Sequence, residues 1–227
     1  MSKAQELNKL FGEWQKEHKF EVFCKDGIVD EDEFGKNMPE VVFLLKDANA
    51  ENQDEADVCK NLSDTANYNS PFGKMWKVLC MWTKIIKEPE VRYSDCCDKN
   101  NKPKASMCEY LKNIAVVNLS KEHGKGTNKQ SELDAKISDS MRDYYGYTTN
   151  ELDIIDPVLV VCCGTYHYLL EKYGVYDKVL PSGARYFTKD SKIFLEMPHP
   201  GIRISYPVLF AYFKEVYSDL PLIKNRR

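Results

Sequence analysis

Residues 41–50 of the sequence, VVFLLKDANA, contain five consecutive apolar residues, from Val41 to Leu45. A short run of β-branched and aromatic side chains is typical of a strand buried on both faces. Lys46 and Asp47 follow directly, so this strand would end by presenting charged groups at the edge of a sheet. Open parallel sheets bind their ligands at the carboxyl ends of their strands. We therefore expect a site near Asp47, with an ordinary solvated loop as the simpler alternative.

Three other stretches have the same buried-strand character: Ile114–Leu119, Pro157–Cys163 and Lys192–Met197. Helical patterns alternate with them, at Ser2–His18, Pro71–Ile86, Ser131–Tyr145, Tyr166–Tyr173 and Ser205–Leu220. The polar stretch Glu51–Ser70 shows no clear periodicity, and residues 88–107 are predicted to be a loop. This alternation predicts an α/β fold of three layers (α/β/α), with a mostly parallel sheet of about four strands between helices. Residues 1–227 would form one domain, with a helix and acidic lead-in at 1–38 and the core at 41–220.

Composition and charge restrict the possible function. The net charge of −3 argues against an indiscriminate nucleic-acid binder. Residues 1–60 hold 8 Lys against 15 Asp or Glu, whereas residues 172–227 hold 10 Lys or Arg against 5 acids, which permits one basic face. The eight cysteines form no CxxC pair or metal-ligand spacing, so we expect reduced thiols, no metal and a cytoplasmic location. No apolar run is long enough for a membrane span, and the N-terminus lacks a signal-peptide pattern.

Each of the four predicted strands ends near a residue suited to a ligand site: Asp47, Asn118, Gly164 and His199. An Asp can orient and activate water as a general base. A fixed Asn amide offers one donor and one acceptor to the edge of a base, and a His can stabilise a developing oxyanion. Simpler roles stay open, because Asn readily caps a turn and a His between two prolines can pack in a rigid loop.

These motifs, in this order, resemble those of the uracil-DNA glycosylase superfamily over roughly residues 41–220. VVFLLKDANA is similar to the first motif, GQDPYH in the best-known branch, with Asp47 at the position of the water-activating Asp. NIAVVNLSK is similar to the middle strand that ends in a base-recognising Asn, here Asn118. LVVCCGTYHYLL, around Gly164, resembles the later strand, glycine and helix, and HPGIRIS (199–205) resembles the last motif, HPSPLS.

The resemblance implies a monofunctional DNA glycosylase that flips a damaged nucleotide out of the stack and hydrolyses its N-glycosidic bond. Asn118 would bind the Watson–Crick edge of uracil, Asp47 would position water beside the oxocarbenium-like sugar, and His199 would stabilise the departing base at O2. Further substrate contacts are implied at Asn49, Phe72 and Gly164, and DNA contacts at Lys121, Gly201, Arg203 and Ser205. We expect a monomer that binds uracil- or damage-containing DNA, with no cofactor, no iron–sulfur cluster and no membrane contact.

The first motif departs from the family pattern, because Leu45 and Ala48 stand where the family has Gly and Pro. Asn49 replaces the bulky residue that excludes thymine, and Gly201 replaces a Ser that contacts phosphate. These departures leave two other functions open. One is a catalytically impaired module of the same fold that binds DNA or a protein partner, and the other is an α/β enzyme for a small nucleotide.

Overall fold

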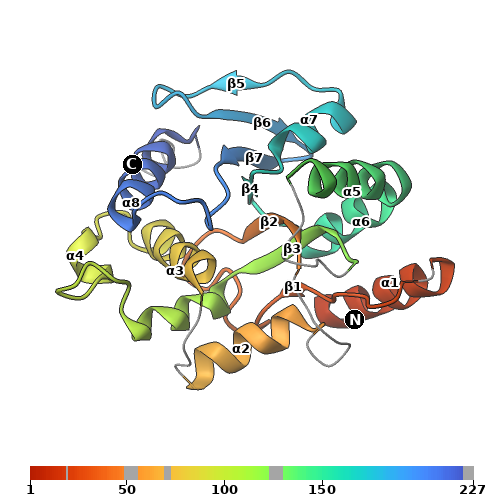
Figure 1. Cartoon of the computed structure of the whole chain (residues 1–227), viewed down its shortest axis with the longest axis horizontal. Helices are drawn as coiled ribbons and strands as arrows, with labels where there is room; N and C mark the ends of the chain where they lie inside the picture. Colours follow the sequence, from red (N-terminus) through yellow and green to blue (C-terminus); the bar gives the residue numbers. More distant parts are fainter. Residues whose placement is uncertain (19, 49–55, 69–72, 123–129, 222–227) are drawn as a thin grey trace.

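The computed structural model of the chain describes residues 1–18, 20–48, 56–68, 73–122 and 130–221 (Figure 1). In this part of the chain, seven strands form one sheet in the order β1-β3-β2-β4-β7-β6-β5. The strands are β1 (Gly27–Ile28), β2 (Val41–Asp47), β3 (Ala115–Ser120), β4 (Leu159–Cys163), β5 (Lys178–Val179), β6 (Arg185–Lys189) and β7 (Lys192–Met197). The helices are α1 (Lys3–Glu17), α2 (Val58–Tyr68), α3 (Lys74–Lys87), α4 (Tyr93–Cys96), the 3-10 helix η2 (Ala105–Asn113), α5 (Gln130–Asp143), α6 (Tyr145–Ile155), α7 (Tyr166–Tyr173) and α8 (Tyr206–Asp219).

The four strands predicted from the sequence form the parallel centre of the sheet. β2 pairs with β3 on one side and with β4 on the other, and β4 pairs with β7. The chain therefore winds outward from β2 to β3 and then crosses back to β4. In an open parallel sheet, such a reversal creates a crevice at the carboxyl ends of the two strands where it occurs, here β2 and β4.

The prediction of about four strands is incomplete, because the sheet has antiparallel edges. β1 pairs with β3 at one edge, while β6 pairs with both β7 and β5 at the other. β1 and β5 have two residues each, which is too short for any periodic pattern. β6 buries only Phe187 fully, so its sequence, RYFTK, lacks the continuous apolar run of the central strands.

Alternate side chains of the central strands pack into two hydrophobic clusters. Val41, Phe43 and Leu45 belong to the first cluster, together with α3, η2 and α8. Val42 and Leu44 belong to the second cluster, together with α1, α5, α6 and α7. Figure 1 shows α3 and α8 on one side of the strands and α5 and α6 on the other. Helices cover both faces of the central sheet, and this explains why residues 41–45 are apolar without alternation.

The predicted helices agree with the structure to within a few residues. α1 begins after Ser2, whose side chain accepts a hydrogen bond from the N–H of Gln5, while the Gln5 side chain binds the N–H of Ser2. Four helices were not predicted. The prediction of a loop over residues 88–107 is wrong in part, because it contains the single turn α4 and the start of η2. The other two are α2 and α6. In α2, among the side chains that the structure describes, only Leu62 is buried, so the sequence shows no apolar stripe. α6 follows α5 almost directly and ends at Ile155, and its C-cap Asp156 has a left-handed conformation. No helix in the described ranges is long and apolar enough to cross a membrane.

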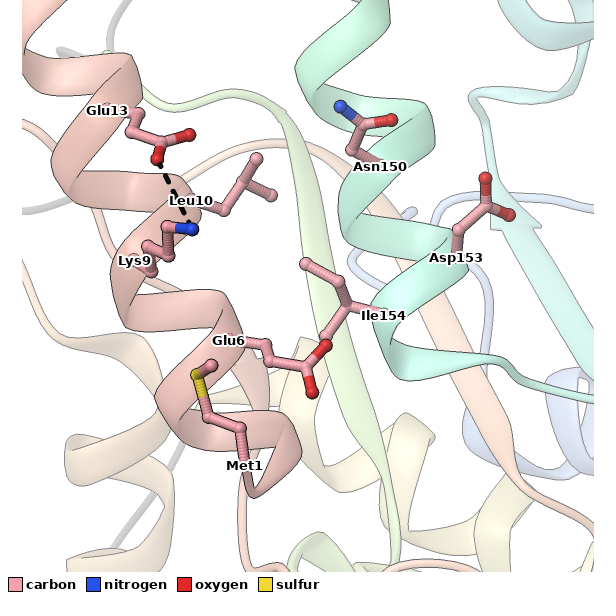
Figure 2. A pocket seen from close by; sticks show the side chains of 8 residues that line it. All are labelled: Met1, Glu6, Lys9, Leu10, Glu13, Asn150, Asp153 and Ile154. Atoms are coloured by element: carbon pink, nitrogen blue, oxygen red, sulfur yellow. Dashed lines mark ion pairs between the residues drawn. The ribbon is translucent and has the colours of Figure 1, made fainter.

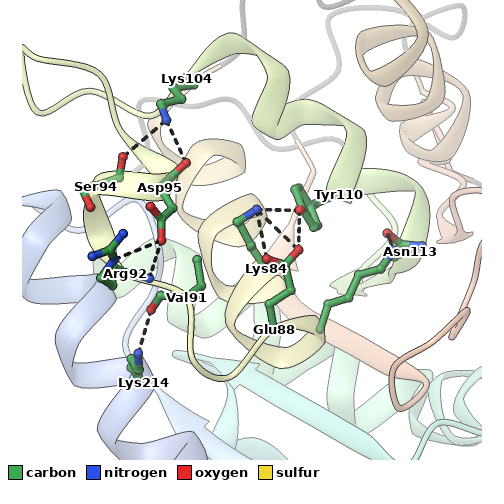
Figure 3. A network of polar contacts seen from close by, with 11 residues as sticks. Lys84, Glu88, Val91, Arg92, Ser94, Asp95, Lys104, Tyr110, Asn113 and Lys214 are labelled. Carbon is green, nitrogen blue, oxygen red and sulfur yellow. Dashed lines mark hydrogen bonds and ion pairs between the residues drawn. The ribbon is translucent and has the colours of Figure 1, made fainter.

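A polar network holds α3 against η2 and α8 (Figure 3). The Nζ of Lys84 donates to the hydroxyl of Tyr110 at 2.8 Å, and this hydroxyl donates to Glu88 at 2.9 Å. On the opposite side, Lys214 of α8 donates to the carbonyl of Val91 at 2.7 Å. Partly exposed bonds of this kind each contribute about 0.5–1.5 kcal/mol to the free energy of unfolding. Their main effect is to fix the helices that cover the first cluster.

Candidate active site

Asp47 and Asn118 lie on neighbouring parallel strands near their carboxyl ends. Leu45 pairs with Asn118 in the sheet, and Asp47 pairs with Ser120. Because side chains alternate along a strand, Asp47 shares the sheet face of Leu45, and Asn118 shares the face of Val116. Leu45 and Val116 both belong to the first cluster. The fold therefore brings these two predicted site residues to the same edge of the sheet, where the Asp47 carboxylate also reaches Lys136 of α5 on the other face.

Two ion pairs with α5 hold the end of β2. The Nζ of Lys46 lies 2.8 Å from a carboxylate oxygen of Asp134, and the Nζ of Lys136 lies 3.6 Å from a carboxylate oxygen of Asp47. Asp134 also accepts a hydrogen bond from the hydroxyl of Tyr168 at 3.1 Å. The Asp47 side chain is 18% exposed, so water can reach its carboxylate. Lys136 fixes this carboxylate and at the same time competes with water for its oxygen atoms.

His199 follows β7 directly and has a defined tautomer. Its Nδ1 accepts a hydrogen bond from the backbone N–H of Gly201 at 3.1 Å, so the neutral imidazole carries its proton on Nε2. Burial lowers the pKa of His199, and the charge of Lys46 lowers this pKa further, whereas Asp47 raises it. No acceptor for the Nε2–H lies among the described residues. His199 is therefore a neutral hydrogen-bond donor close to the ends of β2 and β7.

Two glycines let the chain approach His199 closely. Gly164 has φ +73°, and a Cβ at this position would lie 3.6 Å from the Cβ of His199. The N–H of Gly164 donates to the carbonyl of Met197 at 2.8 Å, which joins the ends of β4 and β7. A Cβ at Gly201 would lie 3.1 Å from both Nδ1 and Cε1 of His199, which is closer than ordinary packing allows. Both glycines thus lie against His199, and Gly201 has a structural reason to lack a side chain.

The side chain of Asn118 is bound by Asp26. The Oδ2 of Asp26 accepts hydrogen bonds from the backbone N–H of Asn118 at 2.7 Å and from its Nδ2 at 2.9 Å. The Oδ1 of Asn118 is buried and accepts no hydrogen bond from the described residues. The sequence did not indicate Asp26, because nothing distinguishes it from the neighbouring acids Asp30 and Glu31.

Lys121 was predicted to contact DNA, and this prediction is wrong because its ammonium group is buried. The Nζ lies 2.5 Å from Asp26 and 2.7 Å from Glu151, and all three side chains are 0% exposed. It also lies over the rings of Phe11 and Trp14 of α1. Burial alone would lower the pKa of Lys121, but the two carboxyl groups raise it above the usual value. Burial and the charge of Asp26 raise the pKa of Glu151 well above its usual value, whereas Lys121 lowers it.

Residues 201–205 form a surface loop between His199 and α8. The Nζ of Lys74 donates to the carbonyls of Ile202 at 2.5 Å and Ile204 at 2.7 Å, which fixes the path of the loop. Arg203 and Ser205 are exposed, as predicted DNA contacts must be, and Ile202 is 41% exposed. Ser205 is the N-cap of α8 and makes no side-chain capping bond. Pro207 has no N–H, so the N–H groups of Tyr206 and Val208 are those left open to an anion in the first turn.

Asn49 and Phe72, which were predicted to contact the base, lie outside the described residues. The structure therefore gives no position for either side chain.

An open groove of ≈ 500 Å³ lies between α1 and α6, apart from these residues (Figure 2). It is lined by Met1, Glu6, Lys9, Leu10, Glu13, Asn150, Asp153 and Ile154. None of the residues that meet at the strand ends contributes to it. We therefore place the candidate chemistry at the strand ends and not in this groove.

No protein-family model and no curated protein matches this chain.

Proposed function

We propose that this protein is a DNA glycosylase, with a three-layer fold of the uracil-DNA glycosylase type, that excises uracil or a related damaged base. The observation that carries the proposal is the state of His199. Its Nδ1 is occupied by the Gly201 N–H, its pKa is lowered by burial and by Lys46, and its Nε2–H has no acceptor among the described residues. A neutral donor of this kind suits an oxygen atom on which negative charge develops during the reaction.

The chemistry requires a donor and a carboxylate on opposite sides of one bond. As the bond between the sugar C1′ and the base N1 breaks, the base leaves as an anion and the sugar becomes oxocarbenium-like. His199 donates its Nε2–H to O2 of the departing base. Asp47 holds the attacking water and accepts its proton as the water oxygen bonds to C1′, which leaves the free base and an abasic sugar.

DNA binding is assigned to the loop of residues 201–205. The exposed Arg203 can contact phosphate or enter the minor groove, and the open N-terminus of α8 at Ser205 can bind a phosphate. Ile202 is an exposed apolar side chain in the turn that begins at His199. A side chain of this type can fill the gap that a flipped nucleotide leaves in the stack.

One observation favours a second function, that of a module which binds DNA without cleaving it. Lys136 lies 3.6 Å from the Asp47 carboxylate, where a glycosylase needs room for a water molecule. In that case, DNA would still bind through the loop of residues 201–205, but the glycosidic bond would stay intact.

The proposal is tested with a labelled oligonucleotide that contains a single uracil, followed by alkali to break abasic sites. We expect the wild type to cleave it, and we expect Asp47→Asn and His199→Ala to lose roughly a hundredfold or more in rate. Asp153→Asn, in the groove between α1 and α6, and His167→Ala, on the exposed surface of α7, are the matched controls and should cleave like the wild type.

Folded protein that leaves uracil intact in both single- and double-stranded DNA would overturn the uracil assignment. A panel of deaminated and alkylated bases would then be examined. Binding to the oligonucleotide without cleavage of any base in the panel would support the non-catalytic module.

A further inference from the structure

The orientation of the Asn118 amide is set by a residue outside the predicted motifs. The carboxylate of Asp26, 0% exposed, receives both the backbone N–H and the Nδ2 of Asn118 on its Oδ2 atom. Its other oxygen, Oδ1, receives the ammonium of Lys121 at 2.5 Å. A carboxylate can only accept hydrogen bonds here, so the NH₂ end of the Asn118 amide must face it. The reversed amide would bring Oδ1 of Asn118 against Oδ2 of Asp26, two acceptors with no proton between them.

We infer that Asp26 is a positioning residue that determines base specificity, because it fixes which end of the Asn118 amide meets the flipped base. This inference rests on the proposed function and names the substrate class of the same site. That class is bases whose edge carries an N–H next to a carbonyl, such as uracil, as opposed to bases with a ring nitrogen next to an amino group, such as cytosine.

The free end of the amide supports this assignment. Oδ1 of Asn118 is buried and has no donor among the described residues, although buried acceptors are nearly always hydrogen-bonded. An N–H of a bound base would supply the missing donor. Nδ2 carries two hydrogens, and Asp26 takes one of them, so one donor also remains for the base. The amide thus offers an acceptor and a donor in a fixed order.

The order of these groups discriminates between bases. With O2 of the base at His199, the edge of uracil presents N3–H and then O4, which match the acceptor and the donor of Asn118. Cytosine in the same pose presents the lone pair of N3 to Oδ1 and its amino group to Nδ2, so both contacts become repulsive. The hydrogen bond from Nδ2 to the Asp26 carboxylate also polarises the amide and makes Oδ1 a stronger acceptor, which increases the preference for N3–H.

The buried cation explains how a carboxylate is kept at this position. Lys121 lies between Asp26 and Glu151 and is covered by Phe11 and Trp14 of α1. The ammonium of Lys121 lies 2.5 Å from the Asp26 carboxylate and 2.7 Å from Glu151. The ion pair therefore anchors the carboxylate that orients Asn118.

The inference is tested by the ratio of kcat/KM values for uracil and cytosine in otherwise identical oligonucleotides. An Asn at position 26 can present either an oxygen or an NH₂ group, so it no longer imposes one orientation on Asn118. We expect Asp26→Asn to lower the uracil-to-cytosine ratio of kcat/KM values at least tenfold.

Asp32→Asn, at an exposed carboxylate nearby in the chain, is the control and should leave this ratio unchanged. A purely structural role for Asp26 would reduce both rates in proportion, and an unchanged ratio in folded Asp26→Asn would overturn the inference while the proposed function stands.

A second measurement needs neither a variant of Asp26 nor catalysis. The side-chain NH₂ resonances of Asn118, assigned with Asn118→Ala, are followed by NMR while free bases are added to the wild type. We expect uracil and hypoxanthine to shift them and cytosine and adenine to leave them in place. This result without any cleavage of DNA would reject the glycosylase and keep the inference. Equal responses to uracil and cytosine, or no response to any base, would overturn it.

Discussion

Nδ1 of His199 accepts a hydrogen bond from the backbone N–H of Gly201, and this same glycine lies so close to the ring that a Cβ would be 3.1 Å from Nδ1. One short contact thus sets both the tautomer and the position of the imidazole. The proton remains on Nε2, the only ring nitrogen left to donate, and in the proposed reaction its acceptor is the departing base.

Gly201→Ala tests this contact. We expect the added methyl group to push the imidazole by a few tenths of an ångström and to reduce the rate of uracil excision about tenfold or more, because the donor must lie within hydrogen-bond reach. The melting temperature should change little, because residue 201 is exposed.

Gly12→Ala in α1 is the control, since a Cβ added at residue 12 meets nothing within 4 Å. It should keep full activity and stabilise the helix by about 1 kcal/mol. Equal activity of the two variants would contradict the importance of the contact.

Lys46→Gln should raise the pKa of His199. Burial is the largest cause of the lowered pKa and Lys46 is the next, so the variant keeps a pKa below the usual 6.5 but above that of the wild type. The folded pKa is lower than the unfolded one, so the unfolded chain takes up the proton first as pH falls. Stability from neutral His199 is therefore present above the unfolded pKa and is lost as pH falls below it.

The measurement is a pH titration of the imidazole nitrogens by long-range ¹H–¹⁵N NMR, with Lys172→Gln, an exposed lysine at the end of α7, as the control. An upward shift in Lys46→Gln alone is expected. An identical His199 titration in wild type and Lys46→Gln would rule out the assigned electrostatic effect.

Glu151→Gln should change how stability depends on pH. The folded pKa of Glu151 is raised well above 4.5 by burial and by Asp26, so its contribution to stability is present below the unfolded pKa and is lost as pH rises through the folded pKa. Gln has the shape of the protonated acid and does not ionise. We expect the free energy of unfolding of Glu151→Gln to exceed that of wild type increasingly as pH rises above 4.5.

Urea unfolding at a series of pH values measures this difference. Glu132→Gln, an exposed glutamate in the first turn of α5, is the control and should follow the wild type at every pH. A constant difference between Glu151→Gln and wild type at all pH values would show that Glu151 does not gain a proton on folding.

Lys74→Met should loosen the loop of residues 201–205. The variant loses the two bonds to the carbonyls of Ile202 and Ile204 but keeps an apolar chain of similar length. We expect faster hydrogen exchange at the amides of both isoleucines and weaker binding to DNA, with little change in melting temperature. Lys9→Met, on the exposed side of α1, is the control and should leave exchange in the loop unaltered. Unchanged exchange in Lys74→Met would mean that the loop keeps its path without these bonds.

The central fold could be predicted from the sequence because burial on both faces leaves a strong signal. Each parallel strand is a short apolar run, and β2 and β7 were located to within two residues at each end. The edge strands β1, β5 and β6 could not be predicted in this way, since their stability comes from pairing with a neighbour and not from a pattern of their own. The polar α2 was missed for a similar reason: it packs against η2 with little of its surface buried.

The candidate site could be predicted only in part. Asp47, Asn118, Gly164 and His199 follow apolar runs, so their arrival at the strand ends could be expected. Asp26 and Lys121 depend on contacts between segments far apart in the chain, and no local pattern separates a lysine buried in an ion pair from one on the surface. The sequence places Lys46 directly before Asp47. However, Lys46 lowers the pKa of His199 only because β2, β4 and β7 pack side by side, which the sequence does not indicate.

The bond between Asp26 and Asn118 joins residues 92 positions apart, and the contact of Lys121 with Glu151 brings in a third, later segment. During synthesis the chain leaves the ribosome from its N-terminus, so Asp26 emerges long before any of its partners. Contacts of such long range form late and slowly. The amide that would face the base therefore gains its orientation only after β3 has been made, and a nascent chain that stops before residue 151 would hold Lys121 without its full set of partners.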